Sequence, residues 1–259
     1  MAAEGLSLAG IGKTFRGRGR TVEALREVSL TCPAGSFTAL IGPSGCGKST
    51  VMRIALGLEA PDTGTARIAG MAPAEAARSG LTGVAFQDAA LLPWRSVMRN
   101  VEAPLEVLGR KRDAHTARVR ALIDLVGLTG YENSLPGELS GGMRQRVAIA
   151  RALVTEPQVL FMDEPFGALD QILRRQMNVE LQRVWAETGS TALLVTHGID
   201  EAVFLADRVL VMQANPGRIV EAIEVPFARP RAPSLWSDPA FHALCDRIAE
   251  ALTGGAVDA

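Results

Sequence analysis

The sequence predicts an α/β fold, and two observations support this prediction. A glycine-rich loop stands between an apolar run at residues 38–41, which is typical of a buried strand, and a helical segment from Val51 onward. Continuous apolar runs at residues 159–162 and 192–195 are typical of strands buried on both faces. No apolar run approaches the roughly 18 residues that a membrane helix requires. A chain of 259 residues suffices for one large or two modest domains with a sizeable core.

The glycine-rich loop has the spacing G-x-x-x-x-G-K followed by serine, which binds phosphate when a strand precedes it and a helix follows. Its glycines let successive N–H groups point toward an anion, and the following helix adds its positive end. Lys48 can place a compact charge on the outer phosphates, and the Ser49 hydroxyl can ligate Mg²⁺. We therefore expect a nucleoside triphosphate to bind through Gly42, Pro43, Ser44, Gly45, Cys46, Gly47, Lys48, Ser49 and Thr50.

Composition and charge narrow the classes of protein further. A hydrophobic content of 47% and a charged content of 21% are typical of a soluble globular protein. The formal net charge of −1 provides no basic footprint for nucleic acid. Three scattered cysteines are too few for a disulfide framework or a zinc site. Since nothing near the N-terminus resembles a signal peptide, we expect a cytoplasmic protein, or one peripheral to a membrane from the cytoplasmic side.

The residues before the loop predict an antiparallel edge. Residues 6–11 and 22–30 alternate loosely between polar and apolar, which favours two strands. Phe15 lies between them, beside a basic turn at residues 16–20. An exposed aromatic ring here could stack on a purine, whereas an ordinary half-buried strand residue would only pack. Its position alone leaves both interpretations open.

The residues after the loop predict two short strands, at 66–70 and 81–86, and then a helix-rich stretch at 97–154. An apolar, proline-broken stretch joins them and contains Trp94. This tryptophan could belong to the core, but a tryptophan beside proline in a loop more often marks a contact surface, which we favour. Within the helix-rich stretch, helical spacing predicts a buried face formed by Val119, Leu122, Ile123 and Val126.

A second helix start suited to an anion lies near residue 140. Ser140 has the character of an N-cap, and Gly141 and Gly142 leave the N-terminus of a helix predicted over residues 147–154 approachable. Taken alone, Ser-Gly-Gly before a helix is a common loop pattern.

Polar residues follow two of the buried strands. A carboxylate at the tip of a strand beside a phosphate loop is the expected second partner of Mg²⁺, so we assign this role to Asp163. Glu164 points to the opposite face and could polarise the attacking water. The alternative is two surface acids that end a strand. His197 stands at the C-terminal end of the strand at 192–195, the edge where ligands bind in open α/β sheets.

The last part of the chain completes the sheet and adds a tail. A helix at 200–206, a strand at 209–212 and an alternating stretch at 219–225 are followed by a linker rich in proline and arginine. A short final helix carries on one face Phe241, Leu244, Cys245, Ile248 and Leu252. This tail is too short for a separate regulatory domain.

These ordered motifs resemble the ATPase subunit of an ABC transporter, over nearly the whole chain. The resemblance rests on residues 42–50, Gln87, residues 139–146, residues 159–165, residues 168–170 and His197. It implies a P-loop NTPase (RecA-like) core with an antiparallel β edge subdomain and an inserted α-helical subdomain that carries the ABC signature. The parts of this single ABC ATPase domain would be the core with its β edge at 1–89 and 158–225, the helical subdomain at 90–157, and a linker and C-terminal helix at 226–259.

The resemblance also implies roles for the residues around ATP. Phe15 resembles the adenine-stacking aromatic, and Gln87 resembles the Q-loop glutamine that senses Mg²⁺ and the membrane partner. Lys48 would act on the transferred phosphate, and Ser49 would join Gln87 and Asp163 around Mg²⁺.

Three further residues match motifs on the catalytic side, and a fourth departs from them. Glu164 resembles the catalytic base, Asp170 the D-loop aspartate, and His197 the γ-phosphate sensor. Gly198 departs from the pattern, because relatives usually carry aspartate after the histidine, and glycine loosens the backbone there.

The partners follow from the same resemblance. Ser140, Gly141 and Gly142 resemble the signature that caps the ATP of the other subunit, so we expect a head-to-tail dimer, most simply of identical chains. Residues 86–88, 91–95 and 143–144 are similar to importers of nitrate, aliphatic sulfonates and taurine, although Ala89 replaces a proline of some relatives. We expect a separate membrane permease near residues 87–94, an extracytoplasmic substrate-binding protein, and a position at the cytoplasmic face of the inner membrane.

Two other classes of protein match the sequence less well. A soluble ABC-type ATPase not coupled to transport is the alternative function, but its translation and repair forms carry a second cassette or long insertions. A P-loop kinase or GTPase would lack the Ser-Gly-Gly signature at 140–142.

Overall fold

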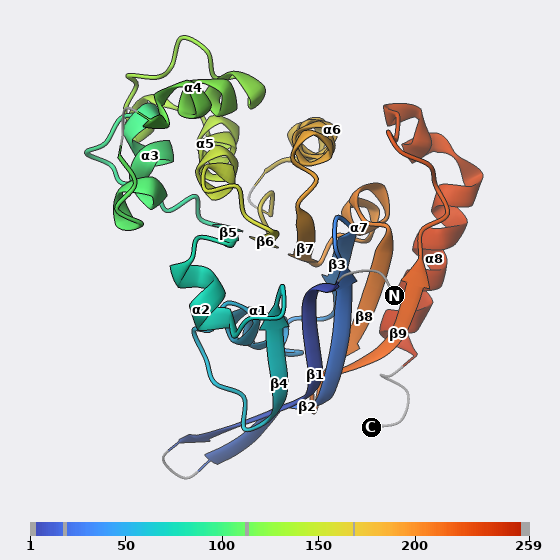
Figure 1. The fold of residues 1–259 in the computed structure, drawn as a ribbon. Helices are drawn as coiled ribbons and strands as arrows, with labels where there is room; N and C mark the ends of the chain where they lie inside the picture. The colour runs from blue at the N-terminus through green and yellow to red at the C-terminus, as the bar shows by residue number, and fades with distance from the viewer. Residues whose placement is uncertain (1–3, 18–19, 112–113, 168, 255–259) are drawn as a thin grey trace.

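The computed structural model describes residues 4–17, 20–111, 114–167 and 169–254, and within them the chain forms two sheets and several helices (Figure 1). Two residues of the basic turn, 18–19, and Ala168 of the motif at residues 168–170 lie outside the described residues. The strands are β1 (Glu4–Gly17), β2 (Arg20–Pro33), β3 (Phe37–Ile41), β4 (Thr63–Ile68), β5 (Thr82–Ala85), β6 (Val159–Asp163), β7 (Thr191–Thr196), β8 (Arg208–Gln213) and β9 (Arg218–Glu224). The α-helices are α1 (Lys48–Ala55), α2 (Pro73–Arg78), α3 (Val97–Val107), α4 (Thr116–Leu125), α5 (Gly141–Leu153), α6 (Gln171–Thr188), α7 (Ile199–Leu205) and α8 (Pro239–Thr253), and 3₁₀ turns span Pro136–Glu138 and Pro233–Ser237.

The central sheet has the strand order β5-β6-β7-β3-β8-β9, and its pairs are parallel except for β8 with β9. The register places Ile41 at the end of β3 opposite Thr196 at the end of β7. It also places Asp163 at the end of β6 opposite Val195. Three strands far apart in the sequence therefore end side by side, and the loops that follow them share one edge of the sheet.

A smaller antiparallel sheet, β2-β1-β4, forms the predicted β edge. Its strands β1 and β2 are longer than predicted. The strand expected at 66–70 is β4 and ends at Ile68, because Ala69 and Gly70 adopt left-handed backbone angles, with φ of 49° and 80°, and turn the chain.

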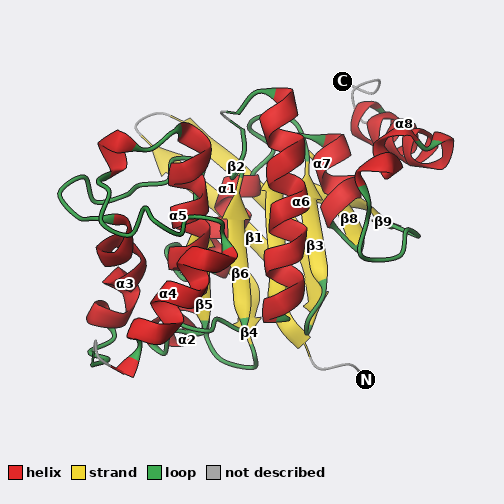
Figure 2. Cartoon of the chain, turned by 90° about the horizontal axis from the view of Figure 1, so that it is seen from above, coloured by secondary structure: helices red, strands yellow, loops and turns green. Residues whose placement is uncertain are grey.

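The side chains of the central strands alternate between two separate apolar cores, as the period of a strand requires. On one face, Leu160, Met162 and Leu194 pack with helices α5, α6 and α7. On the other face, Phe161 and Val195 pack with α1 and the three-stranded sheet. Figures 1 and 2 show α5, α6 and α7 on one side of the sheet, with α1 on the other. The helix starts at Lys48 and at Gly141 thus belong to opposite faces.

The group α3, α4 and α5 shares its core with the sheet. The predicted buried residues of α4 and its end, Val119, Leu122, Ile123 and Val126, are all buried in the same cluster as Leu160 and Leu194. Helix α5 lies so close to β5 that a Cβ on Gly83 would come within 2.0 Å of the Ala152 carbonyl oxygen. Only glycine permits this approach, and it ties the helical group firmly to the edge of the sheet.

Two helices differ from the sequence prediction. The helix expected over 147–154 begins at Gly141, because the Ser140 Oγ accepts a hydrogen bond from the Met143 N–H at 3.3 Å and caps it. The long helix α6 was not predicted. Its buried face mixes apolar side chains with Asn178 and Gln182, so the hydrophobic period in the sequence is weak.

The predicted proline- and arginine-rich linker packs tightly against α7. Arg231 is buried and donates hydrogen bonds to the carbonyl oxygens of Val203, Phe204 and Ala206, at 3.1, 2.9 and 2.8 Å. These are carbonyls at the C-terminal end of α7, where a cation is favoured. Burial lowers the pKa of Arg231 to about 10. Within the described part of the chain, no helix has both the length and the apolar character needed to cross a bilayer.

Candidate functional site

The glycine-rich loop joins β3 to α1 and is packed on its inner side and open on its outer side. Gly47 has a φ of 99°, and a Cβ there would lie 2.6 Å from Leu25 Cδ2, so glycine is required both by its angle and by its neighbour in β2. Pro43, Ser44 and Gly45 are exposed, and so is Ser49 in the first turn of α1. The open side presents a helix N-terminus without acidic residues to any approaching anion.

The side chain of Lys48 is held inside this loop by carbonyl groups of the loop backbone. Its side chain is buried, and Nζ donates hydrogen bonds to the carbonyl oxygens of Gly42 at 2.7 Å and Pro43 at 3.0 Å. The ammonium group is therefore fixed across the loop before any phosphate binds. Such a preorganised cation needs little rearrangement to contact the outer phosphates of a nucleotide.

Two adjacent carboxylates stand at the end of β6. Burial and the neighbouring Glu164 raise the pKa of Asp163 above its usual value, and the charges of Lys48 and Arg53 oppose this rise. Glu164 has a left-handed φ of 45° and donates its N–H to the Val195 carbonyl oxygen at 2.8 Å, which ties this strained residue to β7.

The chemistry of the predicted ligands fits a magnesium ion. In a partly buried site, the charged form of a carboxylate beside a second carboxylate is stabilised by a nearby cation. The predicted ligands Ser49, Asp163 and Gln87 offer a hydroxyl, a carboxylate and an amide, which are the hard oxygen donors that Mg²⁺ prefers.

His197 and Gln87 both approach Glu164. The Nδ1 atom of His197 lies 3.2 Å from Glu164 Oε2, although the histidine side chain is 56% exposed. A Cβ built on Gly167 would lie 3.3 Å from Gln87 Nε2 and 3.4 Å from Glu164 Oε2, so these two side chains flank the same glycine. The structure thus brings Lys48, Asp163, Glu164, His197 and Gln87 together at one edge of the sheet.

Other predicted residues lie away from this cluster or have a structural role as well. Ser140 and Gly141 are exposed at the start of α5, on the opposite face from α1. Asp170 caps α6, because its Oδ1 accepts the Leu173 N–H at 3.0 Å. Phe15 lies in β1 opposite Val22, is 40% exposed, and has Lys13 Nζ 5.3 Å from its ring centre.

The sequence reasoning missed three polar residues near the site. Asn100, Gln145 and Arg151 hold the backbone of the segment around Gln87 by hydrogen bonds from α3 and α5. A sequence signal existed for Gln145, since it lies at helical spacing between the buried residues Gly142 and Ile149 of α5. A polar residue on a buried helical face requires a partner.

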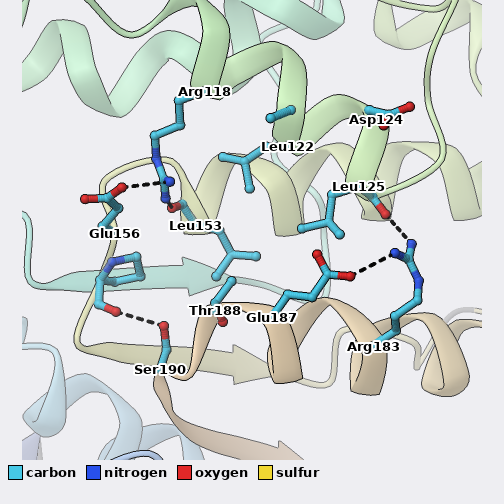
Figure 3. Close-up of a pocket in the computed structure, with 12 residues that line it drawn as sticks. Arg118, Leu122, Asp124, Leu125, Leu153, Glu156, Arg183, Glu187, Thr188 and Ser190 are labelled. Carbon is cyan, nitrogen blue, oxygen red and sulfur yellow. Dashed lines mark hydrogen bonds and ion pairs between the residues drawn. The ribbon is translucent and has the colours of Figure 1, made fainter.

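A cavity of about 700 Å³ lies elsewhere in the described part of the chain (Figure 3). Its lining includes Glu156 before β6 and Ser190 before β7, so it stands at the amino edge of the parallel strands. Arg118 and Arg183 line it as well, and their guanidinium groups donate to the carbonyl oxygens of Leu153 and Leu125. Because ligands of open α/β sheets bind at the carboxyl edge, we do not assign this cavity to the nucleotide.

Gly198, beside His197, does not need to be glycine. Its φ is −85°, and a Cβ there would have only ordinary contacts of 3.4–3.5 Å. Gly198 is the N-cap of α7, and aspartate is favoured at this position. Aspartate also leaves the unfolded chain fewer conformations than glycine does. We expect Gly198→Asp to raise the free energy of unfolding by about 0.4–1 kcal/mol, measured by urea unfolding. Gly189→Asp is the control and should destabilise, because Gly189 has a φ of 63° at the C-terminus of α6.

Comparisons with known proteins agree with this geometry. The family model described as ABC transporter matches residues 25–167, which is more than half of the chain. The taurine import ATP-binding protein TauB of Pseudomonas aeruginosa (strain UCBPP-PA14) is 43% identical, over 94% of this chain and 92% of its own length. The aliphatic sulfonates import ATP-binding protein SsuB of Burkholderia ambifaria is 44% identical, over 97% of this chain and 73% of its own length.

Solved structures show the same fold. The dimeric structure of MJ0796, a bacterial ABC transporter cassette, superposes with a TM-score of 0.74 and 30% identity, over 86% of this chain and all of that one. A dimeric post-hydrolysis state of the same ATP-binding cassette, bound to ADP and Pi, superposes equally well, at 29% identity. The family match, the relatives above 40% identity and the shared fold together show that this chain belongs to the ABC transporter family, as an ATP-binding cassette.

Proposed function

We propose that this chain hydrolyses ATP to power a separate membrane permease in an importer of small solutes of the nitrate, sulfonate and taurine type. The observation that carries the ATPase assignment is the Glu164–His197 contact beside the loop that holds Lys48. The named functions of the two relatives, taurine import and aliphatic sulfonate import, support the transport assignment.

The residues of this cluster divide the chemistry between them. The loop N–H groups and Lys48 bind the phosphates and hold the terminal phosphorus for attack. Glu164 accepts a proton from the attacking water, and the adjacent His197 orients this carboxylate and contacts the terminal phosphate. Gln87, which lies beside Gly167 as Glu164 does, positions the water. Ser49, Asp163 and Gln87 would hold Mg²⁺, which neutralises phosphate charge when bound.

Two copies of the chain form the working unit in this proposal. The phosphate loop and Ser140 start helices on opposite faces of the sheet, so Ser140 is poorly placed to reach the nucleotide of its own chain. A head-to-tail dimer would bring Ser140, Gly141 and Gly142 of one copy to the ATP of the other. The related cassette MJ0796 is dimeric in its solved structures. Phe15 would stack on adenine, and Asp170 would contribute from the interface.

The permease would dock on the apolar segment at residues 91–94. Trp94 lies in this segment and is 73% exposed, whereas Trp185 and Trp236 are buried. The chain would thus sit at the cytoplasmic face of the inner membrane, and an extracytoplasmic binding protein would deliver the solute to the permease.

Trp94→Ala tests this docking site. Aromatic anchors often carry about 2 kcal/mol or more of a binding energy, which corresponds to roughly thirtyfold in affinity. We expect recovery of the permease with tagged chain from native membranes to fall strongly, with KM for MgATP unchanged. Leu58→Ala, which alters a 68% exposed leucine after α1, is the control and should keep permease recovery normal. A collapse of ATP affinity in Trp94→Ala would instead show that Trp94 is structural, and absence of any permease with the wild type would contradict the proposed function.

A further inference from the structure

The segment at residues 86–96, here called the glutamine loop, is held in place by side chains of neighbouring helices that form hydrogen bonds with its backbone. Gln145 Nε2 in α5 donates to the carbonyl oxygen of Phe86 at 2.9 Å and, more weakly, to that of Gln87 at 3.4 Å. The guanidinium of Arg151, two turns later in the same helix, donates to the carbonyl oxygens of Ala89 at 2.6 Å and Ala90 at 2.8 Å.

Three of these four hydrogen bonds are partly buried, so their donors would be costly to leave unpaired. Gln145 is 4% exposed, and burial lowers the pKa of Arg151. A buried amide or guanidinium must find acceptors, and the loop carbonyls supply them. The fully buried Asn100 of α3 holds the second half of the loop, since it pairs with both the N–H and the carbonyl of Leu92, at 2.8 and 3.2 Å, and with the Arg95 carbonyl at 2.8 Å.

The same helix links two functional segments. Helix α5 begins at the Ser140 cap and carries Gln145 and Arg151 in its next turns. A cavity of about 450 Å³ marks where the glutamine loop, the start of α5 and the segment after Glu164 meet, and its lining includes Gln87, Gly141 and Pro165. A hydrogen-bonded helix moves as a rigid element, so a shift of Ser140 is transmitted to the carbonyls that Gln145 and Arg151 hold.

We propose that Gln145 and Arg151 are positioning residues for ATP hydrolysis. They fix the backbone of residues 86–90 to α5, which holds Gln87 beside Glu164 and sets its position relative to Ser140. This inference rests on the proposed role of Gln87. Neither side chain needs to contact the nucleotide.

The test uses the full chain and removes the hydrogen-bond donors while keeping most of the side-chain volume. In Gln145→Met and Arg151→Met, we expect faster amide hydrogen exchange over residues 86–96. Because a displacement of about 1 Å in a catalytic group costs up to 10²-fold, we also expect kcat for MgATP hydrolysis to fall about tenfold or more, with little change in KM. Arg151→Lys keeps one charged donor and should restore part of kcat.

Two matched controls separate positioning from stability. Gln182→Met removes another buried glutamine that donates to a backbone carbonyl, that of Arg231 at 3.0 Å. Arg118→Met removes another arginine that donates to two carbonyls, those of Leu153 and Val154. Both controls should lower thermal stability and leave kcat and exchange in the glutamine loop close to wild type.

Three outcomes would decide against the inference. If Gln145→Met and Arg151→Met lose no more kcat than their controls while Gln87→Ala loses much more, the positioning role is wrong although Gln87 matters. If Gln87→Ala also hydrolyses ATP normally, the proposed role of Gln87 is wrong, and the inference falls with it. Should the methionine variants fail to fold, a wild-type kcat and wild-type exchange in Arg151→Lys and Gln145→Glu would overturn it, since Gln145→Glu replaces a donor with an acceptor.

Discussion

Replacing Glu164 with glutamine is expected to leave ATP binding intact and to lower kcat for hydrolysis by about 10²–10⁴-fold, the usual contribution of a positioned general base. The amide has nearly the same size as the carboxylate and can keep a contact with His197, now 3.2 Å from Glu164 Oε2. It cannot accept the proton of the attacking water. ATP should therefore bind and remain, and the dimer closed on it should accumulate and be visible by size-exclusion chromatography.

Glu156→Gln is a matched control for this experiment. Glu156 is also a glutamate with a left-handed backbone, at a φ of 58°, but it precedes β6 instead of following it and pairs with Arg118 at 2.8 Å. This variant should hydrolyse ATP at a rate close to wild type. Near-normal hydrolysis by Glu164→Gln would exclude Glu164 as the base.

Paired lesions in a mixed dimer are expected to show that each ATP site is shared between chains. Lys48→Ala damages the phosphate loop, and Ser140→Arg places bulk and charge at the start of α5. When one chain carries Lys48→Ala and its partner Ser140→Arg, both lesions fall in the same shared site, and the other site stays whole. When both lesions are on one chain, both shared sites are damaged. If each chain housed its own complete site, these outcomes would be reversed.

Occlusion of MgATP is the measurement for this experiment, because turnover can require both sites. We expect more occluded nucleotide when the lesions are split between chains than when one chain carries both. Ser140→Arg also removes a helix cap, at a cost of about 1 kcal/mol. Ser96→Arg, which removes the cap of α3, controls for this loss and should show no dependence on arrangement. More occlusion with both lesions on one chain would rule out the composite site.

The sequence by itself determined the features whose signals are local. The phosphate loop needs glycines and a lysine at set spacing between a strand and a helix, and all of these are adjacent in the chain. The buried runs at 159–162 and 192–195 and the polar residues that end them are local in the same way, so Asp163, Glu164 and His197 could be proposed without a structure.

Only the tertiary structure decided how these pieces meet. The placement of β7 between β6 and β3 brings His197 to Glu164, and strand order is a property of pairing between distant segments. Ser140 and the phosphate loop lie on opposite faces of the sheet. This separation follows from the strand pairing and from the face of the sheet on which each helix packs.

The buried polar contacts are the clearest limit of sequence reasoning. Gln145 and Arg151 bind carbonyls about sixty residues away in the chain, and Arg231 binds the end of α7 from a segment predicted to be a linker. Every residue carries a backbone carbonyl, so such an acceptor leaves no compositional mark in the sequence. The sequence shows the donor, and only the folded chain shows which backbone it holds.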